Sequence, residues 1–238
     1  MPYVDKPRSD ERRSTCLRLV SETSAADHQE GKEYIPQSLL TEVTGLVPIF
    51  GAAFSKVDMA MAGRVKETTE RREILGKLQT YVRDYWQGLL RRTARENHSV
   101  EVLRMHGLPA EGSLPNPTRN QEWIVWAERV VAGDAAAVGS EEEPGLPPMC
   151  NPTSAQVQAV MEQAKAESAD VSEADRALDD AQAALAELRG QADDLIDQAV
   201  MFLQLNLRKL DPPSRRRIMR TYGVVFKAYE GEVETASE

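Results

Sequence analysis

Residues 154–210, SAQVQAVMEQAKAESADVSEADRALDDAQAALAELRGQADDLIDQAVMFLQLNLRKL, form the longest uninterrupted helical pattern in the chain. Small and apolar residues recur there at intervals of three and four, which places them along one face of a helix. They are Val157, Met161, Ala164, Ser168, Val171, Leu178, Ala181, Leu185, Leu188, Ala192, Leu195, Ala199 and Phe202. Thr153 and Gln156 have the spacing of a capping box at the start of this helix. Because packing of an apolar face supplies most helical stability, so long a helix requires a partner.

The sequence offers that partner in a second helical pattern over residues 35–96. Its apolar stripe consists of Leu39, Val43, Leu46, Phe50, Phe54, Val57, Met61, Val65, Leu75, Leu78, Val82, Tyr85 and Leu89. Pro48 is expected to kink or break this helix, because proline removes a backbone donor. The alanines of the first stripe suit a close, coiled-coil-like seam between the two helices.

Charge favours an antiparallel arrangement of the two patterns. Residues 64–95 hold nine basic and four acidic residues, a net charge of +5. Residues 154–198 hold eleven acidic and three basic residues, a net charge of −8. Each exposed ion pair contributes only about 0–1 kcal/mol, so we expect charge to select the register and apolar burial to supply the stability.

The remaining segments are assigned around this hairpin. Residues 1–34 are polar and are expected to form an arm that is disordered or is ordered by a partner. The helical domain spans 35–223 and includes a proline- and glycine-rich module at 97–153, with short helices over 99–105 and 119–132. A short helix at 214–222 ends at Gly223. Residues 224–238 form a C-terminal tail.

Two faint internal repeats are visible. The sequence NPT occurs at 116–118 and 151–153, each time before a predicted helix, with Gln three residues after the threonine. Residues 102–108 (VLRMHGL) resemble residues 218–224 (IMRTYGV), at an offset of 116. Two explanations of these repeats are open: a structural design shared by the two halves of the chain, and chance similarity between helical sequences. Such a common design predicts related caps at opposite ends of the hairpin.

Composition excludes several classes of protein. The net charge of −9 argues against bulk attraction to nucleic acid or to an anionic membrane. Cys16 and Cys150 are far apart, which predicts no disulfide framework and favours a reducing, cytoplasmic compartment. No signal peptide is recognisable at the N-terminus. The most apolar run, 43–54, is about 12 residues long and is too short for a membrane span.

No constellation of catalytic or metal-binding residues stands out. His28, His98 and His106 lack the spacing that places two ligands on one helical turn. The phosphate-binding, dinucleotide-binding and serine-hydrolase motifs are missing from the sequence. We therefore predict no enzymatic activity, no cofactor and no metal.

Two sets of residues are candidates for protein contacts. The first is apolar and comprises Leu46, Ile49, Phe50, Trp123, Trp126, Val225 and Phe226. The tryptophans are either core residues of the small module or interface residues, which are often tryptophan. The second set is basic and comprises Arg208, Lys209, Arg215, Arg216, Arg217 and Arg220. It suits phosphate, nucleic acid or an acidic protein surface.

The segments RMHGLP at 104–109 and DPPS at 211–214, continuing to YGVV at 222–225, resemble those of an uncharacterised bacterial protein family of similar length. That resemblance implies a bacterial source and no mechanism. The sequence predicts an all-α protein, an elongated antiparallel long-helix hairpin or bundle with a small helical cap and extended terminal arms. The predicted function is a non-enzymatic structural or scaffolding protein that self-associates into a homo-oligomer or filament. The alternative is an adaptor that binds nucleic acid or an acidic protein through 208–220.

Overall fold

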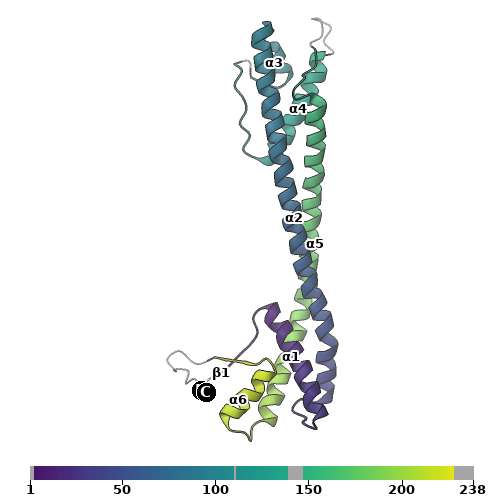
Figure 1. Ribbon diagram of the computed structural model, residues 1–238, viewed down its shortest axis with the longest axis vertical. Coiled ribbons are helices and arrows are strands. Elements are labelled where there is room, and N and C mark those ends of the chain that lie inside the picture. The colour runs from purple at the N-terminus through teal and green to yellow at the C-terminus, as the bar shows by residue number, and fades with distance from the viewer. Residues whose placement is uncertain (1–2, 110, 139–146, 228–238) are drawn as a thin grey trace. The chain divides into compact units, whose positions relative to one another are not determined.

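The protein is an all-α hairpin built on two long helices, as the sequence predicts (Figure 1). The computed structural model describes residues 3–109, 111–138 and 147–227. The long helices are α2 (Gln37–Glu96) and α5 (Ser154–Asn206), and within each compact unit of the chain a part of one lies beside a part of the other. The start of α2 shares a hydrophobic core with the end of α5, and the end of α2 shares another with the start of α5, so they run antiparallel.

Both long helices are continuous. The predicted capping box opens α5: the Thr153 N–H donates to Gln156 Oε1 at 2.9 Å, and the Gln156 N–H donates to Thr153 Oγ1 at 3.1 Å. The expected break at Pro48 is wrong, since α2 runs through this residue. Pro48 lies on the exposed side of the helix, while Leu46 and Phe50 hold the turns around it in the core.

The chain divides into two compact units with similar sets of helices. Unit 1 comprises residues 1–61 and 177–238, and unit 2 comprises residues 62–176. Each contains the start of one long helix and the end of the other. Each also contains a helix of about twenty residues that precedes a long helix, and a short helix that follows one. The shorter helices are α1 (Asp10–Gln29) and α6 (Pro212–Thr221) in unit 1, and α4 (Asn120–Val138) and α3 (Glu101–Met105) in unit 2.

The N-terminal segment corrects the prediction of an extended arm at 1–34. Ser9 caps α1 by accepting a hydrogen bond from the Arg12 N–H, and Cys16, Leu17 and Val20 are buried in the core of unit 1. This helix was missed because its apolar stripe is short, so its periodicity is weak. Its position depends on partners that lie far away in the sequence.

A small sheet joins the two ends of the described chain. Strand β1 (Tyr3–Asp5) pairs antiparallel with β2 (Val225–Lys227), with Val4 opposite Phe226. The segments expected to be extended arms are therefore paired with each other up to Lys227. The rest of the predicted tail, 228–238, lies outside the described residues.

Unit 2 contains the predicted helical module. Helix α3 begins two residues later than expected, and α4 extends from Asn120 to Val138 rather than ending at residue 132. The cap of α4 also differs from the prediction. The carboxylate of Glu122, rather than Gln121, accepts hydrogen bonds from the Thr118 and Arg119 N–H groups at 2.9 and 3.2 Å.

The internal repeat corresponds to one turn that occurs in both units. Gly107 and Gly223 have φ values of 72° and 81°, a region that favours glycine. The residue after each glycine donates its N–H to a carbonyl five residues earlier: Leu108 to Leu103 at 2.9 Å, and Val224 to Met219 at 3.2 Å. The similarity at an offset of 116 therefore corresponds to the same local turn in both units, a common helix ending that fits both explanations of the repeat.

Candidate functional site

One solvent-facing side of α2 in unit 1 is apolar and carries little charge. Helical spacing places five residues together on it, and we call them the α2 apolar face: Gly45, Pro48, Ile49, Ala52 and Met59. The exposed fractions of Ile49 and Met59 are 56% and 68%. Lys56 and Glu42 are the charged residues on the same side of the helix. An exposed apolar stripe of this kind is typical of an interaction surface.

The other apolar candidates are divided between core and surface. Leu46 and Phe50 are buried in the core of unit 1, so Ile49 is the member of that trio that faces solvent. Val225 is exposed on β2, and Phe226 is partly buried against the core of unit 1.

The two tryptophans belong mainly to unit 2 itself. Trp123 is buried, whereas Trp126 is partly buried. Trp86 of α2 packs against both rings, with centroid distances of 6.1 Å to Trp123 and 5.3 Å to Trp126. The Arg129 guanidinium covers the Trp126 ring at 4.5 Å. Core packing therefore accounts for Trp123, and little of Trp126 remains for a partner.

Helix α2 is also apolar enough to meet a criterion for membrane spans. It contains an 18-residue window with a mean hydropathy of 1.4, and 28% of that window is buried. The sequence prediction considered only the apolar run 43–54, which is shorter. Because core helices of water-soluble proteins meet the same criterion, the absence of a membrane span remains a prediction.

The basic residues lie at the end of α5 and along α6. We call them the α6 basic surface: Arg208, Lys209, Arg215, Arg216, Arg217 and Arg220. Residues 208–220 contain one carboxylate, Asp211, which caps α6 by accepting a hydrogen bond from the Ser214 N–H at 3.0 Å. Within the described chain, none of the six cations forms an ion pair or a side-chain hydrogen bond. The structure thus brings the predicted basic residues together and leaves them available.

A surface of opposite charge runs along α5 in the same unit. We call it the α5 acidic face: Asp180, Glu187 and Asp194, with Ala183 and Ala184 between the first two. All five are exposed, and the carboxylates are seven residues apart, which places them about 10 Å apart along one side of a helix. No other described residue forms an ion pair with these carboxylates.

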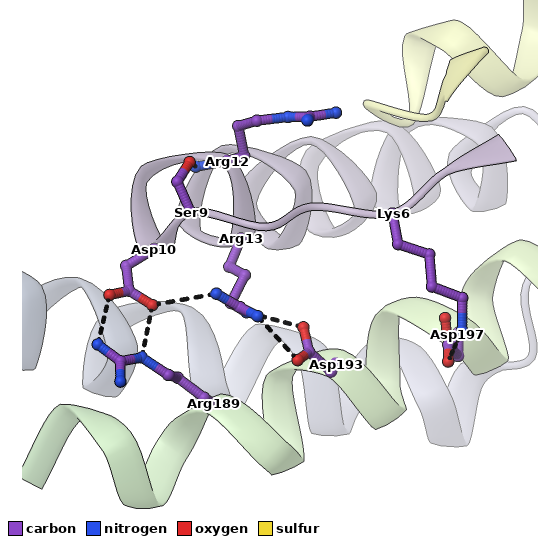
Figure 2. A network of polar contacts seen from close by, with 8 residues as sticks. All are labelled: Lys6, Ser9, Asp10, Arg12, Arg13, Arg189, Asp193 and Asp197. Atoms are coloured by element: carbon purple, nitrogen blue, oxygen red, sulfur yellow. Dashed lines mark hydrogen bonds and ion pairs between the residues drawn. The ribbon is translucent and has the colours of Figure 1, made fainter. Parts of the chain in front are cut away.

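A network of ion pairs attaches the N-terminal segment to α5 (Figure 2). Arg13 forms a two-pronged contact with Asp193 at 2.8 and 3.0 Å, and Arg189 forms one with Asp10 at 2.9 and 2.8 Å. Lys6 contacts Asp197 at 2.6 Å. Hydrogen bonds from Arg189 lower the pKa of Asp10. Sequence reasoning missed this network because its partners are about 180 residues apart.

Unit 2 contains a buried polar cluster centred on Asp134 of α4. Its carboxylate accepts hydrogen bonds from Tyr85 Oη at 3.0 Å, the Met149 N–H at 3.2 Å and Ser154 Oγ at 2.6 Å. Nearby, His106 Nδ1 lies 2.9 Å from the Val102 carbonyl, and burial lowers the pKa of the ring. The adjoining cavity has a volume of about 10 Å³, room for about one water molecule. The cluster therefore ties elements together and has no space for a substrate.

Two further features are weaker candidates. Glu67, Glu70 and Glu167 bring carboxylate oxygens within 4.8 Å of one another, as a divalent cation requires. Partial burial and these neighbours raise the pKa of Glu167. Lys66, however, supplies counter-charge to Glu67 and Glu70 at 3.1 and 3.4 Å. Three acidic residues beside a lysine do not establish a metal site.

The second feature is a groove of about 350 Å³ in unit 1, between the β1 segment and α5. It is lined by Lys6, Cys16 and Met201 among others. Burial raises the pKa of Cys16 to about 11, so its thiol is protonated near neutral pH and is a poor nucleophile. The groove is large enough for a small ligand, but the thiol that lines it is not reactive.

Comparison with protein families, with curated proteins and with solved structures finds no match. The function is therefore argued from the surfaces of this chain alone. Of these, the α2 apolar face and the α6 basic surface contain predicted residues. The α5 acidic face carried a weak signal in the sequence, a carboxylate at every seventh position, and only burial shows which carboxylates lack partners.

Proposed function

We propose that this protein is a non-enzymatic structural or scaffolding protein that self-associates into a homo-oligomer or filament. The α2 apolar face is the observation that supports the proposal. Ile49 and Met59 expose more than half of their side chains, although every residue around them belongs to a regular, well-packed helix. Burial of an aliphatic side chain of this size contributes about 1.5–3 kcal/mol. In a symmetrical contact between two copies, the apolar face of each copy is buried against the other, so this contribution is made twice.

The shape of this face suits contact between helices. Gly45 and Ala52 are small, and the space beside Gly45 is open, so the backbone of another helix can approach closely. Few charges have to be desolvated. Lys56 can extend its ammonium group past the edge of the contact, and Glu42 lies at the end of the face, one turn before Gly45. A contact of this type requires no catalytic residue, cofactor or metal.

A cytoplasmic location is part of the same proposal. Cys16 and Cys150 are both free, and Cys150 is exposed. Free thiols persist in a reducing compartment, whereas secreted proteins usually pair them.

The test is the oligomeric state of the full chain, measured by sedimentation velocity over a range of concentrations. We expect the wild-type chain to associate and Ile49→Asp to weaken the association at least about tenfold, because it buries an unpaired charge. Thr15→Asp is the matched control, since it introduces the same charge at an exposed position of α1. Circular dichroism verifies that both variants remain helical. A wild-type chain that stays monomeric, or an Ile49→Asp variant that associates normally, contradicts the proposal.

A further inference from the structure

We propose that the α6 basic surface of one copy binds the α5 acidic face of a second copy. The inference rests on the proposed self-association and adds a second, different contact to it. The α2 apolar face joins copies through burial of apolar side chains. This second contact joins them through opposite charge.

Unpaired charge of both signs on one unit is the first observation. Unit 1 contains abundant carboxylates. It pairs Asp193 and Asp197 of α5 with basic residues of its N-terminal segment, and Asp10 of that segment with Arg189 of α5. In the described part of the chain, the cations of the α6 basic surface and the carboxylates of the α5 acidic face form no such pairs. These two surfaces are therefore complementary in charge, and every copy of the chain carries one of each.

The apolar parts of the two surfaces also match. Leu205 and Leu210 flank Arg208 and Lys209, and their exposed fractions are 51% and 41%. Across the proposed contact, the exposed alanines at 183 and 184 are small enough for these leucines to pack on them. Arginine side chains beside the leucines are long enough to reach the flanking carboxylates.

Leu205 is the penultimate residue of α5, and it is 51% exposed. Together with Leu210 it forms an apolar edge beside the α6 basic surface that unit 1 does not bury. A second copy can cover this edge.

Nucleic acid is the competing occupant of the basic surface, and three observations disfavour it. The chain has a net charge of −9, which repels a polyanion at a distance. Residues 208–220 contain no aromatic side chain for base stacking, and Tyr222 beyond them is buried. The exposed leucines have no role against a phosphate backbone. An acidic helix with small apolar residues uses both the cations and the leucines.

Because the two surfaces differ, the contact is heterologous and each copy has one of each. Copies can therefore add one after another, which suits a filament or a ring. This asymmetry provides a sharp test. A copy without its basic surface can still bind, through its acidic face, a copy that lacks only the acidic face.

The experiment uses the full chain with Ile49→Asp, which removes the α2 contact. Variant one adds Arg217→Gln and Arg220→Gln, and variant two adds Asp180→Asn and Glu187→Gln. We expect the Ile49→Asp parent to associate in about 0.1 M NaCl and to dissociate in about 1 M NaCl, where charges are screened within about 3 Å. Each variant alone is expected to be monomeric, and an equimolar mixture of the two is expected to form 1:1 dimers. Sedimentation velocity measures the parent at both salt concentrations, each variant alone and the mixture.

Two controls separate this inference from its alternatives. Arg8→Gln with Arg18→Gln makes the same charge change at exposed positions of unit 1 and is expected to leave the parent's association unchanged. A labelled DNA duplex is titrated with the parent and variant one, with fluorescence anisotropy as the readout.

The outcomes are distinct for the two proposals. A mixture that stays monomeric overturns this inference. If, in addition, the parent binds DNA in a salt-dependent way and variant one does not, nucleic acid is the occupant of the basic surface. If the wild-type chain associates but the Ile49→Asp parent is monomeric at every salt concentration, self-association through α2 stands and the charged contact fails.

Discussion

The hydroxyl of Tyr85 donates a hydrogen bond to the buried carboxylate of Asp134, with 3.0 Å between the two oxygens, and thereby ties α2 to α4. The same carboxylate accepts from the Met149 N–H and from Ser154 Oγ, so it also holds the segment that leads into α5. A single buried acceptor thus connects three elements of unit 2. Buried polar groups with all their partners in place specify a unique packing.

Asp134→Ala is expected to lower the free energy of unfolding by about 3 kcal/mol, because it leaves buried donors without an acceptor. Tyr85→Phe removes one donor and leaves the others paired, so we expect a loss of about 1 kcal/mol. Urea denaturation followed by circular dichroism measures both. Equal losses in the two variants would show that the carboxylate does not organise the cluster.

Protonation of His106 is expected to destabilise unit 2 in mildly acidic solution. Burial lowers the pKa of this ring in the folded protein below its ordinary value of 6.5, despite the nearby Asp134 carboxylate. Arg92 and Tyr85 are the other polar groups that lie close to it. The unfolded chain therefore binds the proton more readily than the folded chain. Stability is fully present above pH 6.5 and falls as the pH drops toward the folded-state pKa.

The measurement is the urea midpoint between about pH 5 and about pH 7.5, a window that lies above the titration of ordinary carboxylates. His106→Gln is the comparison, since it keeps a polar group and removes the titration. We expect the pH dependence of the wild-type midpoint to disappear in this variant. A slope that persists would assign the effect to another group.

Two glycines in helices are expected to respond oppositely to alanine. A Cβ at Gly133 of α4 would lie 2.6 Å from His106 Cα and 2.7 Å from the Met105 carbonyl oxygen, both backbone atoms. A Cβ at Gly190 of α5 would meet nothing within 4 Å. Gly133→Ala should therefore destabilise the protein by about 1–3 kcal/mol through overpacking. Gly190→Ala should stabilise it by about 0.5–1 kcal/mol, because alanine favours the helix.

Thermal unfolding followed at 222 nm compares the two alanine variants under identical conditions. A lower midpoint for Gly133→Ala and a higher midpoint for Gly190→Ala are expected. If Gly133→Ala is neutral, α3 and α4 are less closely packed than the structure shows.

The ion pair between Arg13 and Asp193 is expected to hold α1 against α5. Its geometry is two-pronged, and the arginine side chain is largely buried, so the coupling should be about 1 kcal/mol rather than negligible. A double-mutant cycle with Arg13→Gln and Asp193→Asn measures it by chemical denaturation. Hydrogen exchange across residues 10–29 should increase in either single variant. Additive single effects would show that the pair is incidental.

Much of the hairpin could be predicted because its signals are local. The capping box at Thr153 and Gln156, the alanine stripe of α5 and the glycines at 107 and 223 act within a few residues of themselves. Helix periodicity and backbone preference operate at that range. The pairing of the long helices followed, because a long amphipathic helix must bury its stripe.

The position of α1 and the exposure of individual side chains were decided by tertiary contacts. Helix α1 has few apolar residues of its own and is held by Asp193 and Arg189, about 180 residues away. Leu46 and Ile49 are both large aliphatic residues on one helix, yet one is buried and the other faces solvent. The difference depends on which side of α2 the other helices cover.

The sequence by itself determined that two long helices exist, where they begin and that they pair, since those properties depend on neighbouring residues. The tertiary structure alone decided which charges and apolar side chains remain uncovered, because that depends on segments brought together from opposite ends of the chain. The candidate interaction surfaces belong to this second kind of information.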